Sequence, residues 1–246
     1  MLLQPIPTET SVADPFEIAL ASLMPLFLLL GYIPPVYNLT FKIVREKESR
    51  TKETMRIMGM TDLAYWLSWF VFYTLINTVV TSLAWGMLLI NVINYSQPMY
   101  LWMFFWLYGE AVFGQIIFLQ ALFTRSKYAG IVSTVIYFMG VIVNKSVTGD
   151  DVSRSSKMLA SIFPQVCLMQ GSNIFANYEA TGVGLGSSTA DVEYIGYSFR
   201  SALWMMFASF LIFTMLGLYL DKVVPQPFGK RLHPCFCFQR SYYQRK

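Results

Sequence analysis

Few side chains in this sequence are suited to catalysis or metal binding. Its single histidine, His233, and its three cysteines do not form the spaced sets that hold zinc or frame a disulfide network. The glycine cluster at 182–186 follows no predicted strand and does not match the GxxxxGK[ST] phosphate loop. We therefore expect no catalytic residue, no metal site and no cofactor bound by this chain.

The chemistry that remains is that of a binding surface in residues 41–59, FKIVREKESRTKETMRIMG. The composition favours helix, and the pairs Glu46–Arg50 and Glu48–Lys52 have the spacing and order that stabilise one. Apolar residues recur at three- and four-residue steps, and Gly59 is suited to ending a helix. The pattern predicts an amphipathic helix. It is either a docking surface for a cytoplasmic partner or a solvated loop that only fixes topology.

The composition is that of an all-α membrane protein. Hydrophobic residues make up 55% of the 246 residues and charged residues only 13%, about half the usual share of a soluble domain. The charges cluster in short segments between long apolar runs, and most of these runs are long enough to cross a bilayer as a helix. The net charge of +4 is small and clustered, so nucleic acid is not an expected partner.

Uncharged runs predict about five transmembrane helices. The expected spans are about 18–40, 63–90, 100–123, 129–143 and 201–220. The prolines of the first span predict a kink or an irregular end near Pro34. The run 129–143 is short for a crossing, and 158–178 is apolar but rich in Asn and Gln. We interpret these two segments as the halves of a re-entrant helical hairpin, buried in protein or lining a wet cavity.

The distribution of Lys and Arg sets the expected orientation. If the segment 41–59, the turn after 123 and the tail 221–246 are cytoplasmic, 14 of the 18 basic residues lie inside, as the positive-inside rule favours. The N-terminus is then outside and the C-terminus inside. In this orientation Asn94 and Asn144, both in N-x-S/T sequons, are outside and are candidate glycosylation acceptors, which makes the chain a candidate glycoprotein.

Glu110 is the one acid deep inside an expected span. An intramembrane carboxylate is by default a candidate functional residue. We interpret Glu110 as buried against a neighbouring helix or facing a wet crevice, with a role in transport as the alternative.

The segment VREKESRTKETMRIMGM, residues 44–60, resembles the element that follows the second transmembrane helix in the A subfamily of ABC transporters, the lipid exporters. The shared pattern, EKExRxKExMRxMG, is long and specific. MPLFLLLGYI at 24–33, LFTRSKYAG at 122–130, NYEATGVG at 177–184 and YLDKVVPQPFG at 219–229 resemble further parts of the family in the same order. The resemblance covers nearly the whole chain from about residue 16.

The resemblance implies one transmembrane half of an exporter, of the ABC-2 membrane-domain type. It implies that residues 41–59 are a coupling helix resting on a nucleotide-binding domain, with residues 124–128 as a second contact, and that segment 129–178 contains a hairpin dipping into the outer leaflet. The residues expected to couple to that domain are Glu46, Lys47, Glu48, Arg50, Lys52, Glu53, Arg56, Met58, Gly59, Arg125 and Lys127. Expected partners are a lipid substrate, the bilayer, the nucleotide-binding domain with its ATP and Mg²⁺, and a second transmembrane half.

The sequence departs from the family in lacking ATPase motifs, so this chain by itself is not expected to hydrolyse ATP. We expect a fragment of a longer transporter or a degenerate half, in the plasma membrane or an endomembrane. Two alternatives remain open: an ABC exporter half for a non-lipid cargo, and an ATP-independent channel or scaffold. A channel should carry polar residues along one face of several spans, and these spans carry few.

Overall fold

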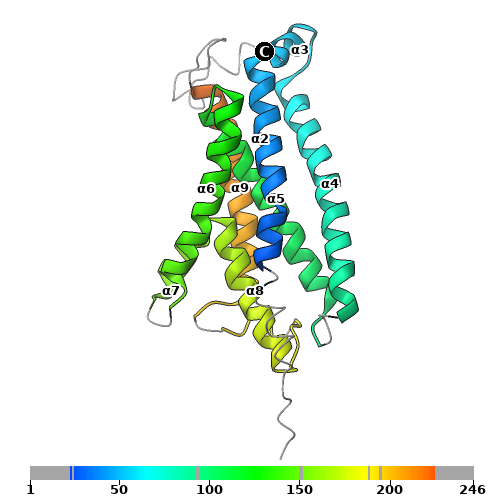
Figure 1. Ribbon diagram of the computed structural model, residues 1–246, viewed down its shortest axis with the longest axis vertical. Coiled ribbons are helices and arrows are strands. Elements are labelled where there is room, and N and C mark those ends of the chain that lie inside the picture. The colour runs from blue at the N-terminus through cyan, green and yellow to red at the C-terminus, as the bar shows by residue number, and fades with distance from the viewer. Residues whose placement is uncertain are drawn as a thin grey trace, which may run out of the picture.

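The computed structural model describes residues 23, 25–91, 95–149, 152–187, 189–193 and 196–224. These residues form a bundle of long helices and no strand (Figure 1). The helices are α2 (Ile33–Glu48), α3 (Thr51–Ile57), α4 (Asp62–Asn91), α5 (Pro98–Leu122), α6 (Ser126–Val147), α7 (Arg154–Ala160), α8 (Pro164–Ala180) and α9 (Phe199–Val223).

Five helices in the described part of the chain are long and apolar enough to cross a membrane. They are Pro25–Glu48, Asp62–Leu89, Pro98–Leu122, Ser126–Val147 and Phe199–Val223. The expected all-α membrane fold with five spans is confirmed. The first span is interrupted at Tyr32, where α2 begins with two prolines in its first turn, at the place where the sequence predicts a kink.

The helix α5 is the centre of the bundle. It is buried along most of its length and packs against α9, α4 and α2, and its aromatic side chains fill the core. Two glycines bring α5 and α9 together. An added Cβ on Gly114 would lie 2.8 Å from the carbonyl oxygen of Phe210, and one on Gly217 would lie 2.6 Å from the carbonyl group of Ile117. The two backbones are therefore in direct contact.

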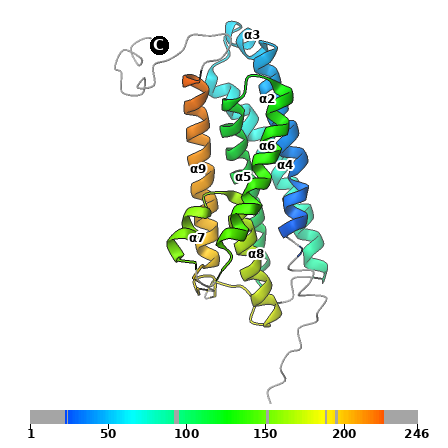
Figure 2. The same cartoon turned by 60° about the vertical axis from the view of Figure 1, so that its left-hand side comes forward.

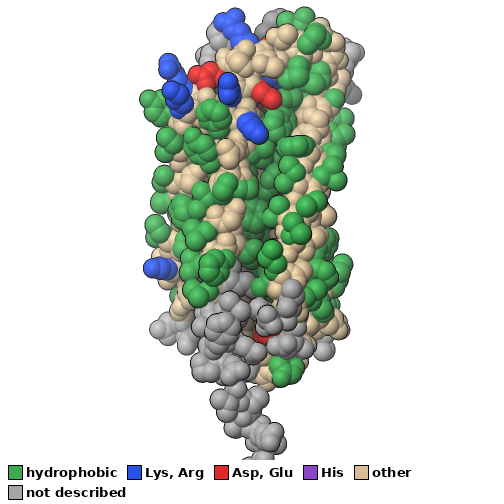
Figure 3. All heavy atoms as spheres, turned by 45° about the vertical axis from the view of Figure 1, so that its right-hand side comes forward, with side chains coloured by type: hydrophobic (Ala, Val, Ile, Leu, Met, Phe, Trp, Pro, Cys, Tyr) green, Lys and Arg blue, Asp and Glu red, His purple; other side chains and the backbone are tan. Residues whose placement is uncertain are grey.

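The outer faces of the bundle are covered by apolar side chains. On α4, large apolar side chains are exposed at every fourth position, from Leu63 to Met87. On α9 the exposed apolar side chains include Trp204, Leu211 and Met215. Figure 3 shows one face of the bundle, which includes α4; hydrophobic side chains lie along most of its length, and Lys, Arg, Asp and Glu are gathered mainly at one end. A soluble protein could not expose so much contiguous apolar area, whereas a bilayer covers it.

The re-entrant hairpin differs from the one expected. The segment 129–143 lies within α6, which has 22 residues and, at 1.5 Å per residue, a length of about 33 Å, enough to cross the hydrocarbon core. The apolar run is shorter than the helix because Asn144 and Lys145 end the run but not the helix. The hairpin is instead made by α7 and α8, so the predicted pairing of 129–143 with 158–178 is wrong.

The turn between α7 and α8 lies half-way along the bundle. There, Ser209 in the middle of α9 donates to the carbonyl oxygen of Ile162 at 2.8 Å, and Gln165 donates to Gln115 of α5 at 2.8 Å. From this depth α8 leads away toward the end of the bundle opposite α3 (Figure 2).

At that opposite end, Glu179 of α8 fastens the hairpin to the α4–α5 loop. Its carboxylate accepts hydrogen bonds from the backbone amides of Tyr95 at 2.8 Å and Ser96 at 3.2 Å and from the Ser96 hydroxyl. Gly184, with a φ of +72°, passes so close to Tyr95 that an added Cβ would lie 2.1 Å from its carbonyl oxygen. The hairpin and the α4–α5 loop are therefore one connected unit.

Candidate functional site

The expected coupling helix 41–59 is not one helix. Its first part continues the first span as α2 to Glu48, and the chain then breaks at Ser49 and Arg50, where Arg50 has a left-handed φ of +61°. The short helix α3 follows, and Gly59, with a φ of +101°, turns the chain into α4. The prediction of one continuous helix that carries the i,i+4 pairs Glu46–Arg50 and Glu48–Lys52 is therefore wrong, because the chain leaves the helix between the members of each pair.

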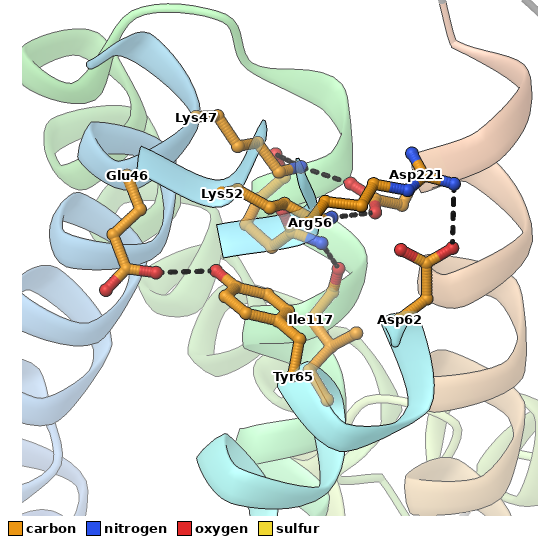
Figure 4. Close-up of polar contacts among 9 residues, drawn as sticks. Glu46, Lys47, Lys52, Arg56, Asp62, Tyr65, Ile117 and Asp221 are labelled. Carbon is orange, nitrogen blue, oxygen red and sulfur yellow. Dashed lines mark hydrogen bonds and ion pairs between the residues drawn. The ribbon is translucent and has the colours of Figure 1, made fainter. Parts of the chain in front are cut away.

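The break brings two lysines to one carboxylate. In a continuous helix, Lys47 and Lys52 would point about 140° apart, because each residue turns the helix by about 100°. Here both bind Asp221 at the end of α9, and the Lys52 ammonium lies 2.7 Å from the carboxylate (Figure 4). A left-handed residue other than glycine costs about 1–2 kcal/mol.

The Lys47–Lys52–Asp221 triad is removed from solvent. The side chains are 7%, 12% and 7% exposed, so each charge must be compensated by the protein. The triad has one positive charge more than the carboxylate neutralises. The Lys47 ammonium also donates to the carbonyl oxygen of Gln120 at 3.5 Å, and the Lys52 ammonium lies 4.9 Å from the ring centre of Tyr65. A carbonyl dipole and an aromatic face stabilise the remaining charge.

Two further acids of the segment tie it to other spans. Glu46 accepts a 2.8 Å hydrogen bond from the hydroxyl of Tyr65 on α4 (Figure 4). Glu48 accepts from the backbone amide of Ser126 at 3.0 Å and from its hydroxyl at 2.7 Å, at the first turn of α6. With Asp221 on α9 and Gln120 on α5, the segment 46–52 contacts the same end of all four other spans.

The remaining predicted coupling residues lie on the outside of this end. Arg50, Arg56, Met58, Gly59, Arg125 and Lys127 are exposed, and Glu53 is half-buried in the first turn of α3. Arg56 pairs with Asp62 at 3.4 Å, close to the tip formed by Ile57 and Met58. Ile57 is 86% and Met58 74% exposed. The predicted site thus separates into an inner group, bound to the spans, and an outer group facing away from the bundle.

Sequence reasoning missed Asp221, Tyr65 and Ser126, which hold the inner group in place. Asp221 carried a usable signal, because it is an acid directly after an apolar span in an otherwise basic segment. Tyr65 carried none, since tyrosine is common at the ends of spans. Ser126 lies within the predicted second contact, residues 124–128, but nothing in the sequence indicated that it binds Glu48.

Comparison with known protein families identifies the family of this chain. The chain matches the family model described as ABC-2 family transporter protein over residues 2–219. It belongs to the ABC-2 transporter family. This ABC-2 protein is therefore an integral, multi-pass membrane protein, and the five apolar helices agree with that assignment.

Its relatives belong to the A subfamily of ABC transporters, as the sequence resemblance indicated. It is 30% identical to the retinal-specific phospholipid-transporting ATPase ABCA4 of Bos taurus over 98% of this chain and 11% of that protein. It is 26% identical to ATP-binding cassette sub-family A member 2 of Rattus norvegicus, over 98% of this chain and 10% of that protein. It is 30% identical to the cholesterol transporter ABCA5 of Rattus norvegicus, over 89% of this chain and 13% of that protein. The chain spans about a tenth of these relatives' length.

Glu110 of this ABC-2 protein is buried in a polar cluster between α4 and α5. Its carboxylate accepts hydrogen bonds from Asn77 at 3.1 Å and Thr74 at 3.2 Å. Asn77 in turn accepts from the hydroxyls of Tyr32 at 2.8 Å and Thr81 at 3.4 Å. The interpretation that Glu110 is buried against a neighbouring helix agrees with this geometry, and the cluster joins the first three spans at mid-depth.

Replacing Asn77 with Leu is expected to lower the free energy of unfolding by at least about 2 kcal/mol. The substitution leaves the Tyr32 hydroxyl and one Glu110 oxygen without their buried partner, and each orphaned group costs about 1–3 kcal/mol. Unfolding in mixed detergent micelles measures the change. Ser82→Ala on the same helix is the control, because its bond to Trp102 is exposed. Equal stability of the two variants would show that the cluster contributes nothing.

The structure describes one of the two candidate glycosylation sites, Asn144, and not the other, Asn94. Asn144 lies in α6 and is only 8% exposed, so a glycan attached there would have no space, and the expectation of modification at Asn144 is not supported. Asn94 lies outside the described residues, as do His233 and the cysteines of the tail. Among the residues that the structure describes, no three side chains of His, Cys, Asp or Glu are grouped to hold a metal ion.

Proposed function

We propose that this chain is a membrane half of an ATP-driven lipid exporter. The α2–α3–α4 end faces the cytoplasm, the N-terminus is outside and the C-terminus is inside. ATP and Mg²⁺ bind in a separate nucleotide-binding domain that docks on the outer group, and a second transmembrane half completes the transporter. The names of two relatives, a phospholipid-transporting ATPase and a cholesterol transporter, support lipid as the cargo.

One observation carries this proposal. The segment 46–52 makes hydrogen bonds or ion pairs to α4, α5, α6 and α9, while the side chains of Ile57 and Met58 at the adjoining tip are exposed. A partner that displaces α3 therefore displaces the ends of all the spans together. No residue needs to perform covalent chemistry. Nucleotide binding would shift the populations of two packings of the spans, by as much as the docked domain favours one packing over the other.

The exposed tip also has the composition of a docking surface. Large apolar side chains next to arginines are the residue types enriched at the centres of protein interfaces. The arginines and lysines at this end of the bundle, among them Arg125 and Lys127 at the start of α6, support a cytoplasmic position for it by the positive-inside rule.

The test uses the natural full-length protein in vesicles that contain a fluorescent phospholipid. A quencher added outside the vesicles reports how much of the fluorescent phospholipid is in the outer leaflet. Wild type is expected to move the lipid only with ATP and Mg²⁺. The double variant Ile57→Asp, Met58→Asp is expected to lose lipid movement by about tenfold or more, because an interface anchor contributes about 2 kcal/mol. Val183→Asp is the control, since Val183 is 62% exposed at the opposite end of the bundle.

Three outcomes would contradict the proposal. Movement of lipid or solute without ATP would indicate a channel or scaffold. ATP-dependent movement of a non-lipid cargo alone would indicate an exporter of another class. Equal activity of the tip variant and the control would show that the partner domain docks elsewhere.

A further inference from the structure

A groove lies between the first span and α4, in the half of the bundle remote from α3. It has a volume of about 360 Å³ and is lined by Phe27, Leu28, Gly31, Tyr32, Pro35, Val80, Ala84, Met87 and Leu88. It exists because α2 packs on α5 and α6 while α4 packs on α5, so that the far halves of the first span and α4 diverge.

Small residues give the groove its width. An added Cβ on Gly31 would meet no atom within 4 Å, so the groove is open beside this residue. Ala84 faces it from the other wall. The one polar group of the lining side chains, the Tyr32 hydroxyl, is turned inward and donates to Asn77 at 2.8 Å. The groove therefore offers hydrocarbon walls and has no polar group in need of a partner.

The dimensions of the groove are those of one lipid tail. Each wall is nine residues long, from Phe27 to Pro35 and from Val80 to Leu88, which is about 12 Å of helix. One leaflet contributes about 15 Å of hydrocarbon depth. The volume is at the lower end for ligand pockets, too small for a whole phospholipid and far narrower than a helix about 10 Å across. Phe27 and Met87, 64% and 72% exposed, flank the opening toward the bilayer.

We infer that this groove holds one hydrocarbon chain of a phospholipid that enters sideways from the surrounding leaflet. The inference rests on the proposed function, under which this half of the bundle faces the outer leaflet and the groove receives a chain of the exported lipid. Bilayer hydrocarbon is as apolar as these walls, so the attraction comes from van der Waals contact alone. The chain is held briefly and released, as a transporter requires.

The experiment uses the full-length protein in phosphatidylcholine vesicles without ATP. A phosphatidylcholine with a photoactivatable diazirine near the end of one chain is cross-linked, and the adducts are mapped by mass spectrometry. In wild type we expect the adducts to concentrate on the lining residues of the first span and α4. Gly31→Phe fills the groove from one wall and Ala84→Phe from the other, and each should lower these adducts several-fold.

The matched control is Gly86→Phe. Gly86 is also a helical glycine with no atom within 4 Å of an added Cβ, but it does not line the groove, so its adducts should equal those of wild type. Adducts spread evenly over the exposed faces of α4 and α9, and unchanged by Gly31→Phe and Ala84→Phe, would overturn the inference. So would labelling by a photoactivatable sterol in place of the phospholipid, or protein cross-links in the groove.

Failure of the proposed function gives a different result. If ATP moves no lipid but the adducts still concentrate in the groove and respond to the two filling variants, the groove binds a chain and the export proposal is wrong. If ATP still drives lipid movement but the adducts are spread evenly over the apolar faces, the export proposal stands and the groove inference is wrong.

Discussion

Replacing Asp221 with Ala is expected to lower the free energy of unfolding by about 3–5 kcal/mol. The substitution leaves Lys47 and Lys52 as two buried ammonium groups whose shared partner is gone, and an uncompensated buried charge has a cost of this size. Thermal and detergent-titration unfolding of the purified protein measures the change. Asp191→Asn is the control, because its pair with Arg200 is more than half exposed and such pairs contribute at most about 1 kcal/mol.

A triple variant separates stability from transmission of force. Replacing Lys47 and Lys52 with Met and Asp221 with Leu removes all three charges, and well-packed apolar replacements of a buried ion pair are often neutral or stabilising. We expect this protein to fold as stably as wild type and to bind ATP in its full-length form, but to move lipid poorly, because α9 is no longer held to the loop. Full lipid movement by the triple variant would show that Asp221 only stabilises the fold.

Replacing Gly217 with Leu is expected to lower the free energy of unfolding by about 3 kcal/mol. The new Cβ would lie 2.6 Å from the carbonyl group of Ile117 and 2.7 Å from the amide nitrogen of Phe118. These are backbone atoms of a buried helix and cannot move aside, so the cost is at the upper end for overpacking. The same unfolding measurements apply.

Gly86→Leu is the control for this prediction. The same change is made in another spanning helix, at a position where nothing lies within 4 Å, and we expect a difference of less than about 1 kcal/mol from wild type. If both leucine variants unfold like wild type, α5 and α9 are not in backbone contact in the membrane.

The features that could be predicted are those set by local composition. Charge-free runs locate the spans, and the basic segments mark one end of the bundle. The break at Ser49 and Arg50 was not predictable, because helix propensity and the i,i+4 pairs both favour a continuous helix. The partner that decides the matter, Asp221, lies 169 residues from Lys52. A local sequence pattern cannot reveal a contact between residues that lie so far apart in the chain.

The hairpin was misassigned for a related reason. The apolar run 129–143 ends at polar residues, yet α6 continues through Asn144, which is buried against its neighbours, and Lys145, whose long side chain can reach the membrane surface. The true first arm, α7, has seven residues, among them Arg154 and Lys157, and no hydropathy pattern marks it. The depth of the turn that follows α7 is known from its contacts with other spans, such as those of Ile162 with Ser209 and of Gln165 with Gln115.

The apolar belt of this protein is uneven in height, and the bilayer must respond to it. On α4 the exposed apolar side chains run from Leu63 to Leu89, about 39 Å, whereas on α6 they run from Tyr128 to Ile142, about 21 Å. A hydrocarbon core of about 30 Å fits neither. Tilting of α4, or thickening beside α4 and thinning beside α6, closes the mismatch. By this measure the hydrocarbon core is expected to be thinnest beside α6 and thickest beside α4.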